Sequence, residues 1–348
     1  MELKRLITEL CSLMTVSGYE YRSIDRLRAL VGESFDEIST DRVGNVRLFR
    51  RCGREGAPLV MIDTHFDEIG MLVTKIHEGG FLSFTSVGGL DLSILQASDV
   101  IIYGKETLRG VIASIPPHLR KAKDSDKLTD IPELLIDTGY EKEELEKLVS
   151  VGTPVGFAPI YSELLGENLV GKSLDNKACA ACAVYALASL KKEDLAADVC
   201  LLLSTHEETV NIGGAAVGGF ELCPDYAMVI DVNLAEVPEA PKHETVGYNK
   251  GISIAISAVT DRRLTKMTEA LCCEKEIRYT RVAAPSSTGT NTPALNLAGR
   301  GVPVADIGLP LKAMHTNTEI MNMNDANDLV KLVCEFVCSK EIREAFAQ

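Results

Sequence analysis

Three short, uninterrupted runs of apolar residues are the clearest feature of the hydrophobic pattern along the chain. They are Leu59–Ile62, Val199–Ser204 and Tyr226–Ile230. An uninterrupted apolar run of this length is typical of a strand that is buried on both faces of a parallel sheet. Two further segments, Val46–Phe49 and Ile252–Val259, are also expected to be strands.

Helical patterns lie between these runs. Helices are predicted where apolar residues recur every three to four positions or where small residues dominate, at residues 3–13, Glu20–Val31, Ala178–Leu190, Thr260–Cys273 and Asn324–Phe346. Strands that alternate with helices predict an α/β fold, in which helices flank a mixed sheet.

The pattern changes between Glu68 and about Leu164. Short β-type runs follow one another closely here and are separated by glycine-rich turns such as Glu78–Gly80. Such spacing predicts a small barrel-like β domain. We therefore expect residues 1–67 and 165–348 to form a catalytic α/β domain, with residues 68–164 inserted as a lid or oligomerisation domain. The charged segment Ala122–Thr129 lacks an apolar period and is predicted to be a mobile loop.

Length and charge narrow the classes of function. A chain of 348 residues is long for a single core, which fits two domains. With 36 basic and 50 acidic residues, its net charge of −14 argues against nucleic-acid and membrane partners. No apolar run approaches the ~18 residues of a membrane span, and we expect no signal peptide.

Most of the ten cysteines lie in apolar runs, where a free cysteine acts as a small hydrophobic residue, and a reducing cytoplasm is the expected location. One C-x-x-C motif, Cys179–Cys182, has no second pair and therefore does not predict a zinc ribbon. A buried helix face is our interpretation of this motif, and a thioredoxin-type role is the alternative.

Acidic residues and histidine follow all three apolar runs. His65, Asp67 and Glu68 follow the first run, Glu207 and Glu208 the second, and Asp231 the third. In open α/β sheets, ligands bind outside the carboxyl ends of the strands, so these side chains predict one polar site. Adjacent carboxylates in a closed site need a positive partner or a proton. The alternative for Glu207 and Glu208 is a solvent-exposed turn in which the strand passes into a loop.

Individual residues also allow simpler interpretations. His65 and Asp67 share one face of an extended backbone, as in a metal-bound histidine that donates to a carboxylate, but they would also fit a hydrogen-bonded pair without metal. Asp175 precedes a predicted helix and would serve equally as its N-cap. His315 lies in a predicted loop, where histidine is usually solvated.

Taken together, the motifs of the chain resemble the glutamyl aminopeptidase, or tetrahedral aminopeptidase, family of dinuclear metallo-exopeptidases, which is also labelled deblocking aminopeptidase or cellulase-like. The match covers nearly the whole chain. The segments that carry it are VSGYE (16–20), THFDEIGMLVTKI (64–76), FTSVGGLD (84–91), GVIASIPPHL (110–119), VGTPVGF (151–157), GKSLDNKA (171–178), THEETVNIGGA (205–215), VIDVNLA (229–235) and MHTNTEI (314–320).

The resemblance implies a zinc-exopeptidase-like fold with two metal ions. His65 and Asp231 would bind one ion, Glu208 and His315 the other, and Asp175 would bridge both, with a cis peptide bond after Asp175. Nitrogen and oxygen ligands without thiolate suit Zn²⁺ best, with Co²⁺ or Mn²⁺ as alternatives.

The activity that the resemblance implies is hydrolysis of N-terminal residues from small peptides. Glu207 would activate a metal-bridging water as general base and then act as general acid, and Asp67 would orient His65. The family commonly forms homo-oligomers, from dimers to dodecamers. The chain departs from the family pattern at His206, which would line the site or pack beside it, and at Asn291, which is expected near the substrate pocket.

Three other functions stay open from the sequence. A metal-dependent amidohydrolase or deacylase of N-acyl amino acids would use much the same ligands. A glucan hydrolase would normally use paired carboxylates without metal. A metal-binding assembly protein would need the ligands but no base.

Overall fold

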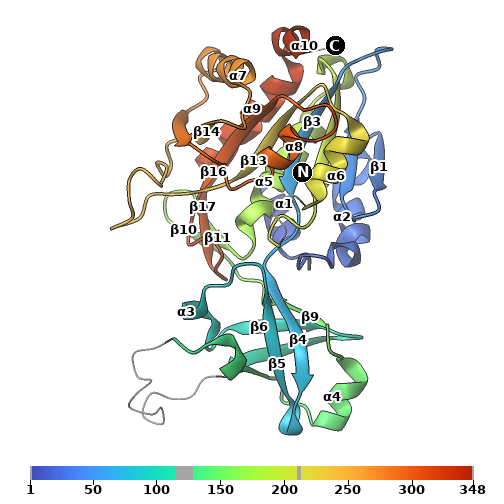
Figure 1. Ribbon diagram of the computed structural model, residues 1–348, viewed down its shortest axis with the longest axis vertical. Helices are drawn as coiled ribbons and strands as arrows, with labels where there is room; N and C mark the ends of the chain where they lie inside the picture. The colour runs from blue at the N-terminus through green and yellow to red at the C-terminus, as the bar shows by residue number, and fades with distance from the viewer. Residues whose placement is uncertain (1, 114–127, 210–212, 347–348) are drawn as a thin grey trace.

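The computed structural model describes residues 2–113, 128–209 and 213–346. Within these residues, eleven strands form one sheet and six form a closed barrel. Figure 1 shows the barrel at one end of the molecule, while the sheet, its helices and both termini lie at the other end. The prediction of a mixed α/β fold with an additional β-barrel is confirmed.

The sheet places the three apolar runs side by side. Its main path is β1 (Glu37–Thr40), β2 (Val46–Arg50), β12 (Asp198–Ser204), β3 (Leu59–His65), β13 (Tyr226–Leu234), β16 (Val304–Lys312), β17 (Glu319–Asn322), β11 (Asn168–Gly171) and β10 (Tyr161–Leu164). Off this path, β14 (Ile252–Ser257) pairs with β15 (Tyr279–Ala284) and β16. Because β12, β3, β13 and β16 are parallel neighbours, their carboxyl ends meet at one edge.

Helices cover both faces of this sheet. Val60 and Ile62 of β3 belong to the large core that includes α1 (Leu3–Cys11), α5 (Leu174–Ser189) and α9 (Met323–Cys338). Met61, on the opposite face, belongs to a smaller core with α6 (Gly213–Leu222) and α8 (Thr292–Asn296). This alternation explains why the strand has no polar side chain between these residues: neither face meets water.

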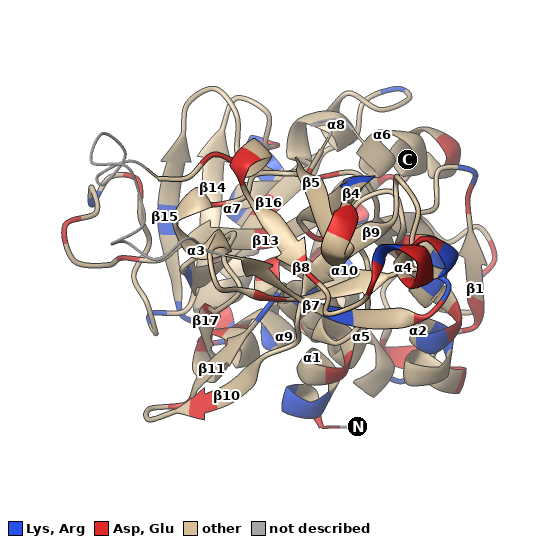
Figure 2. Ribbon diagram, turned by 90° about the horizontal axis from the view of Figure 1, so that it is seen from below, with Lys and Arg blue, Asp and Glu red and all other residues tan. Residues whose placement is uncertain are grey.

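The remaining helices adjoin the large core or the barrel. They are α2 (Ile24–Val31), α7 (Arg262–Glu274) and α10 (Lys340–Phe346) in the sheet-containing part, and α3 (Leu92–Leu95) and α4 (Lys142–Leu148) beside the barrel. In Figure 2 the ribbon of α4 carries the colours of both acidic and basic residues. Single 3-10 turns occupy Glu20–Ser23, Gly32–Ser34, Glu78–Gly80, Ile131–Glu133 and Lys192–Asp194.

Two helix predictions need comment. Cys179 and Cys182 are fully buried on α5, as the interpretation as small buried side chains requires. The prediction of one helix over Asn324–Phe346 is wrong, because α9 ends at Cys338 and α10 begins at Lys340. Ser339 between them is extended, with ψ of 114°, and its hydroxyl accepts the Ile342 N–H, so it begins a new helix.

The barrel follows the first polar loop of the sheet directly. Its closed order is β4 (Gly70–Ile76), β5 (Phe81–Val87), β8 (Leu135–Asp137), β7 (Thr107–Ala113), β6 (Asp99–Tyr103) and β9 (Pro154–Phe157). Along β7, buried Leu108 and Ile112 alternate with exposed residues, which is the period of a strand with one face in a barrel core.

The division of the chain at residues 68 and 164 stays a prediction. Strand β10 (Tyr161–Leu164), which that division assigns to the inserted part, pairs with β11 of the large sheet. The predicted mobile loop Ala122–Thr129 lies outside the described residues except for its last two positions, 128 and 129. In the described part of the chain, no helix is both long enough and apolar enough to span a lipid bilayer.

Candidate active site

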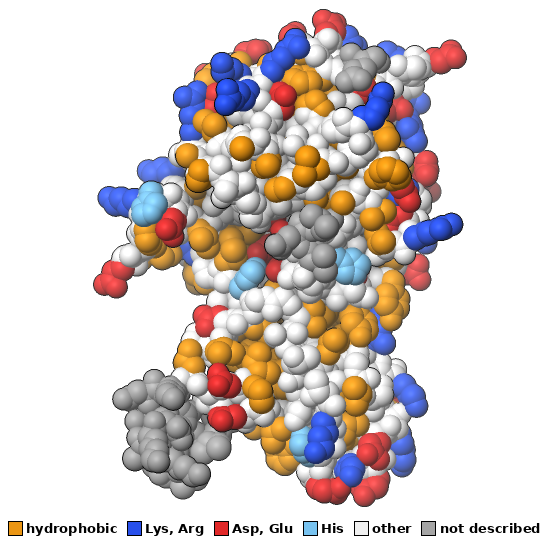
Figure 3. All heavy atoms as spheres, viewed as in Figure 1, with side chains coloured by type: hydrophobic (Ala, Val, Ile, Leu, Met, Phe, Trp, Pro, Cys, Tyr) orange, Lys and Arg blue, Asp and Glu red, His pale blue; other side chains and the backbone are white. Residues whose placement is uncertain are grey.

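All the predicted site residues meet at the carboxyl edge of the parallel strands. His65 ends β3, Asp231 lies in the last part of β13, and Glu207 and Glu208 follow β12. Asp175 lies at the start of α5, and the peptide bond between Asp175 and Asn176 is cis. His315 lies in the loop between β16 and β17. Figure 3 shows histidine and acidic side chains at the surface where the barrel adjoins the larger part.

A cavity of about 260 Å³ opens over these side chains. Its lining consists of His65, Asp175, Glu207, Glu208, Asp231, Val232, Gly289, Met314 and His315. Six of these nine residues are therefore predicted site residues. The seventh predicted residue, Asp67, is fully buried behind them.

Asp175 lies between the two histidines. Its Oδ1 is 3.0 Å from Nε2 of His65, and its Oδ2 is 3.4 Å from Nε2 of His315. Asp231 Oδ1 lies 3.5 Å from the same nitrogen of His65, and Glu208 Oε2 lies 3.3 Å from that of His315. Two groups result, each with one imidazole and two carboxylates, and Asp175 belongs to both. In each group the ligand atoms lie within 4.8 Å of one another, close enough to surround a metal ion.

The backbone carbonyl of Asp67 determines which ring nitrogen of His65 carries the hydrogen. Nδ1 of His65 lies 3.1 Å from the backbone oxygen of Asp67 and 3.5 Å from its carboxylate. A carbonyl only accepts, so Nδ1 carries the hydrogen and Nε2 is the nitrogen that faces Asp175 and Asp231. A ring nitrogen that faces two carboxylates requires a proton or a metal cation between them. The donor set therefore fits a cation.

The carboxylates of the site also require positive charge. Burial raises the pKa of Glu207 to about 8, that of Glu208 to about 7 and that of Asp231 to about 6. Hydrogen bonds to Asp175 and Glu208 raise the pKa of His315 to about 11. Burial alone would raise the pKa of Asp175, but the two histidines hold it below its usual range. Without positive charge, the acids would not all ionise near neutral pH.

The side chain of Asp67 holds the following ligand loop. Its two carboxylate oxygens accept the backbone N–H groups of Glu207, at 3.2 Å, and Glu208, at 3.1 Å. His206, just before them, has a left-handed backbone with φ of 62°. This is an additional contact of Asp67 beyond the predicted one with His65.

Two buried glutamates near the site, Glu319 and Glu68, make contacts that sequence reasoning did not predict. Glu319 accepts the backbone N–H groups of Asp175 and His315, both at 3.0 Å. Glu68 forms ion pairs with Lys172 and Lys177, on either side of Asp175 in the chain. The one available signal was their position inside segments that already contained site residues.

The two departures from the family pattern lie beside the cavity and not in its described lining. Asn291 is 2 % exposed, and its amide donates to Asp63 and to Ser204, both at 2.9 Å. Its side chain is thus held beneath the strand ends, while Gly289, two residues before it, lines the cavity; that Asn291 lies near the substrate pocket stays a prediction. Nδ1 of His206 lies 2.9 Å from the Thr205 hydroxyl.

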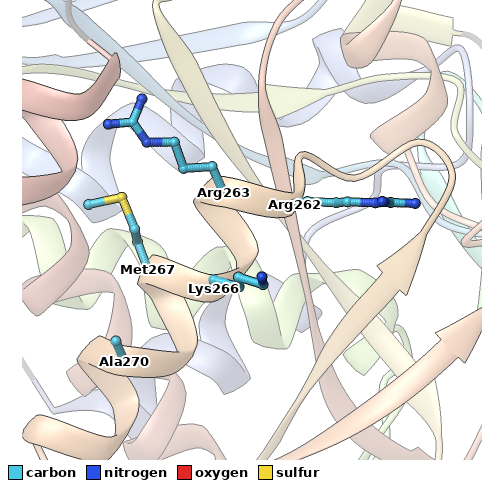
Figure 4. Close-up of a pocket in the computed structure, with 5 residues that line it drawn as sticks. All are labelled: Arg262, Arg263, Lys266, Met267 and Ala270. Atoms are coloured by element: carbon cyan, nitrogen blue, oxygen red, sulfur yellow. The ribbon is translucent and has the colours of Figure 1, made fainter.

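A second, open cavity of about 450 Å³ lies over α7. Figure 4 shows its lining residues Arg262, Arg263, Lys266, Met267 and Ala270 along one helix. Among the described residues, this lining contains no carboxylate and no histidine, so these five side chains do not resemble a hydrolytic or metal site.

Comparison with solved structures defines the class of the protein. Aminopeptidase APDkam598 from Desulfurococcus kamchatkensis has a TM-score of 0.90 at 28% identity, covering 99% of this chain and 97% of that chain. The TET1 peptidase of Pyrococcus horikoshii has a TM-score of 0.85 at 26% identity, covering 97% and 99%. The chain is a peptide hydrolase of this fold.

Sequence comparison then gives the family. The lysyl aminopeptidase of Pyrococcus furiosus is 28% identical over 322 residues, which are 91% of each chain. The sequence model of the M42 glutamyl aminopeptidases matches residues 44–332. The chain belongs to the M42 glutamyl aminopeptidase family, and the predicted resemblance is confirmed. The metal dependence of this family agrees with the histidine and carboxylate groups at the strand ends.

Proposed function

We propose that this protein is an aminopeptidase that uses two divalent cations to remove N-terminal residues from small peptides. The observation that carries the proposal is the pair of ligand groups joined by Asp175. His65 and Asp231 would hold one cation, and Glu208 and His315 the other. Three protein ligands for each cation leave further positions open, as in catalytic zinc sites. Zn²⁺ suits these donors best, and Co²⁺ or Mn²⁺ would also be accepted.

The cations, when bound, would polarise the scissile carbonyl and make the attacking water more acidic. Glu207 supplies the proton transfer. Its carboxylate lines the cavity but belongs to neither ligand group, and its Oε2 lies 4.0 Å from Nε2 of His65. It is therefore placed to take the proton of the water and to deliver it to the leaving amine.

Asp67 supports this division of roles between two adjacent glutamates. Because it accepts both of their N–H groups, the backbone of Glu207 and Glu208 is held in one arrangement. Asp67 also accepts from the His65 ring through its carbonyl, which leaves the other ring nitrogen for a cation.

Removal of metal tests the proposal. The protein would be dialysed against EDTA, and release of the anilide from an aminoacyl-anilide would be followed before and after addition of Zn²⁺ or Co²⁺. We expect the activity to disappear with the metal and to return with it. Full activity after removal of metal, verified by elemental analysis, would contradict the proposal.

Two matched substrates separate the alternatives. A free dipeptide and its N-acetylated form should differ strongly, with cleavage of the free form only; preference for the acetylated form would favour the amidohydrolase. The glucan hydrolase is less favoured, because the carboxylates contact histidines and do not stand as an isolated pair. Release of reducing sugar in the presence of EDTA would support it.

We also propose that the chain forms a homo-oligomer. The TET1 peptidase of P. horikoshii assembles into a tetrahedron or a large octahedral shell. Light scattering after size exclusion should give a mass well above the 37.7 kDa of one chain. A cytoplasmic location is a further proposal, supported by the ten free thiols, which a reducing compartment preserves.

A further inference from the structure

Glu319 connects two segments that are remote from each other in the chain. It is the first residue of β17 and pairs with Gly171 of β11. Its side chain is 2 % exposed, and its two oxygens accept different backbone N–H groups. Oε2 accepts from Asp175 and Oε1 from His315, each at 3.0 Å. One carboxylate thus holds the backbones of both residues, which themselves lie in contact.

Both segments adopt backbone conformations that need support. Ala313 and His315 have φ of 55° and 62°, and Ser173, before Asp175, has φ of 54°. Residues with a Cβ rarely adopt this left-handed region, and they stay there only when the surroundings determine it. Glu319 is such a support, because its strand is paired on both sides, with β11 and with β16.

We infer that Glu319 is a positioning residue, which sets the distance between Asp175 and His315 so that both meet one cation without rearrangement. The inference rests on the proposed function. The role of Glu319 is additional to the proposed function, because Glu319 is not among the described lining residues of the cavity and belongs to neither ligand group. Asp67 provides the matching contact on the opposite side, where it accepts from Glu207 and Glu208. The backbones of four site residues, which lie in three segments of the chain, are thus held in pairs by two buried carboxyl groups.

Glu319→Gln tests this role. Glutamine keeps the shape and one acceptor oxygen but presents an NH₂ group to the other backbone N–H, so either Asp175 or His315 loses its partner. Partners of this kind typically contribute about 10- to 100-fold to metal affinity. We expect a Zn²⁺ affinity roughly 10- to 100-fold lower by titration calorimetry on the metal-free chain. The absorption spectrum of the Co²⁺-loaded chain should change as well, because the ligand geometry relaxes.

Asp325 on α9 offers a matched control. It is fully buried, and its two oxygens accept the N–H groups of Asn249, at 2.8 Å, and Gly251, at 2.7 Å, away from the cavity. Asp325→Asn removes the same charge and the same acceptor. We expect it to lower thermal stability but to leave Zn²⁺ affinity and the Co²⁺ spectrum unchanged.

The outcomes distinguish the inference from the proposed function. If the unmodified chain binds fewer than two Zn²⁺ ions, the proposed function fails. If it binds two and Glu319→Gln binds them equally well, only the role of Glu319 is wrong. Should Glu319→Gln not fold, Glu319→Asp would replace it, since it keeps the charge on a shorter stem. Glu319→Asp should also bind Zn²⁺ at least about tenfold more weakly, and unchanged affinity would overturn the inference.

Discussion

Replacing Glu68 by glutamine should destabilise the fold strongly. Glu68 lies between two buried lysines: Nζ of Lys172 is 2.5 Å and Nζ of Lys177 is 2.8 Å from the same carboxylate oxygen. The side chains of Glu68 and Lys172 are 2 % exposed, and that of Lys177 is fully buried. Glu68 also accepts the N–H of Thr15 at 3.1 Å. These charges are therefore buried away from bulk solvent, which would otherwise screen them.

The structure gives the magnitude in two ways. Removing one partner of a buried ion pair leaves an uncompensated charge and costs about 3–5 kcal/mol. Independently, burial alone would raise the pKa of Glu68, but the two lysines lower it from 4.5 to about 2. This shift corresponds to about 3 kcal/mol. The folded pKa lies below the unfolded one, so this stabilisation is present above pH 4.5 and is lost as pH falls toward 2.

Urea unfolding in EDTA, followed by circular dichroism, would measure the effect without a contribution from metal. At pH 7 we expect the free energy of unfolding of Glu68→Gln to be lower by about 3–5 kcal/mol. Asp99→Asn is the control: it breaks the pair with Arg109, at 2.7 Å, whose side chains are 46% and 68% exposed. It should cost less than about 1 kcal/mol. Equal losses for the two variants, or a loss for Glu68→Gln that persists at pH 2, would refute the assigned role of burial.

Three further outcomes follow from the site and the barrel. Glu207→Gln should still bind two Zn²⁺ ions but lose about 10²- to 10⁴-fold in kcat; a rate near that of the unmodified chain would exclude it as the base. None of the nine described residues that line the cavity is Lys or Arg, so leucyl- and methionyl-anilides should exceed glutamyl-anilide by about tenfold or more in kcat/KM; the reverse order would contradict this. The Gly80→Ala variant should have a lower melting temperature than the Gly139→Ala variant. Both glycines have positive φ, but a Cβ on Gly80 would lie 1.6 Å from the Tyr140 carbonyl oxygen; equal melting temperatures would argue against this clash.

The parts of the fold that follow from a local pattern could be predicted. The run Leu59–Ile62 predicts its own strand, because both of its faces meet apolar cores. The residues that follow such runs share an edge for topological reasons, so His65, Glu208 and Asp231 could be grouped before any distance was known. The break at Ser339 was missed because a serine within an apolar helical period looks the same whether it faces solvent or begins a new helix.

Contacts between residues that are remote in the chain could not be predicted. Glu319 accepts the backbone N–H of Asp175, 144 positions away, and the side chain of Asn291 donates to the carboxylate of Asp63, 228 positions away. Neither pairing has a signature in the sequence. For the same reason, the sequence did not indicate that the side chain of Asn291 is buried against Asp63. Such residues become recognisable only when the fold has brought the two segments together.

The adjacency of Glu207 and Glu208 shows how backbone contacts resolve an ambiguity in the sequence. The two glutamates are chemically identical, and nothing in their order says which would bind metal. In the fold their carboxylates approach different histidines: Oε2 of Glu208 lies 3.3 Å from Nε2 of His315, and Oε2 of Glu207 lies 4.0 Å from Nε2 of His65. Because Asp67 holds both N–H groups, the pair cannot rotate to exchange these positions without losing two hydrogen bonds. Asp67→Asn should therefore impair Glu207 and Glu208 together, with weaker Zn²⁺ binding and lower kcat, whereas loss of only one of the two would show that the loop is held by other contacts.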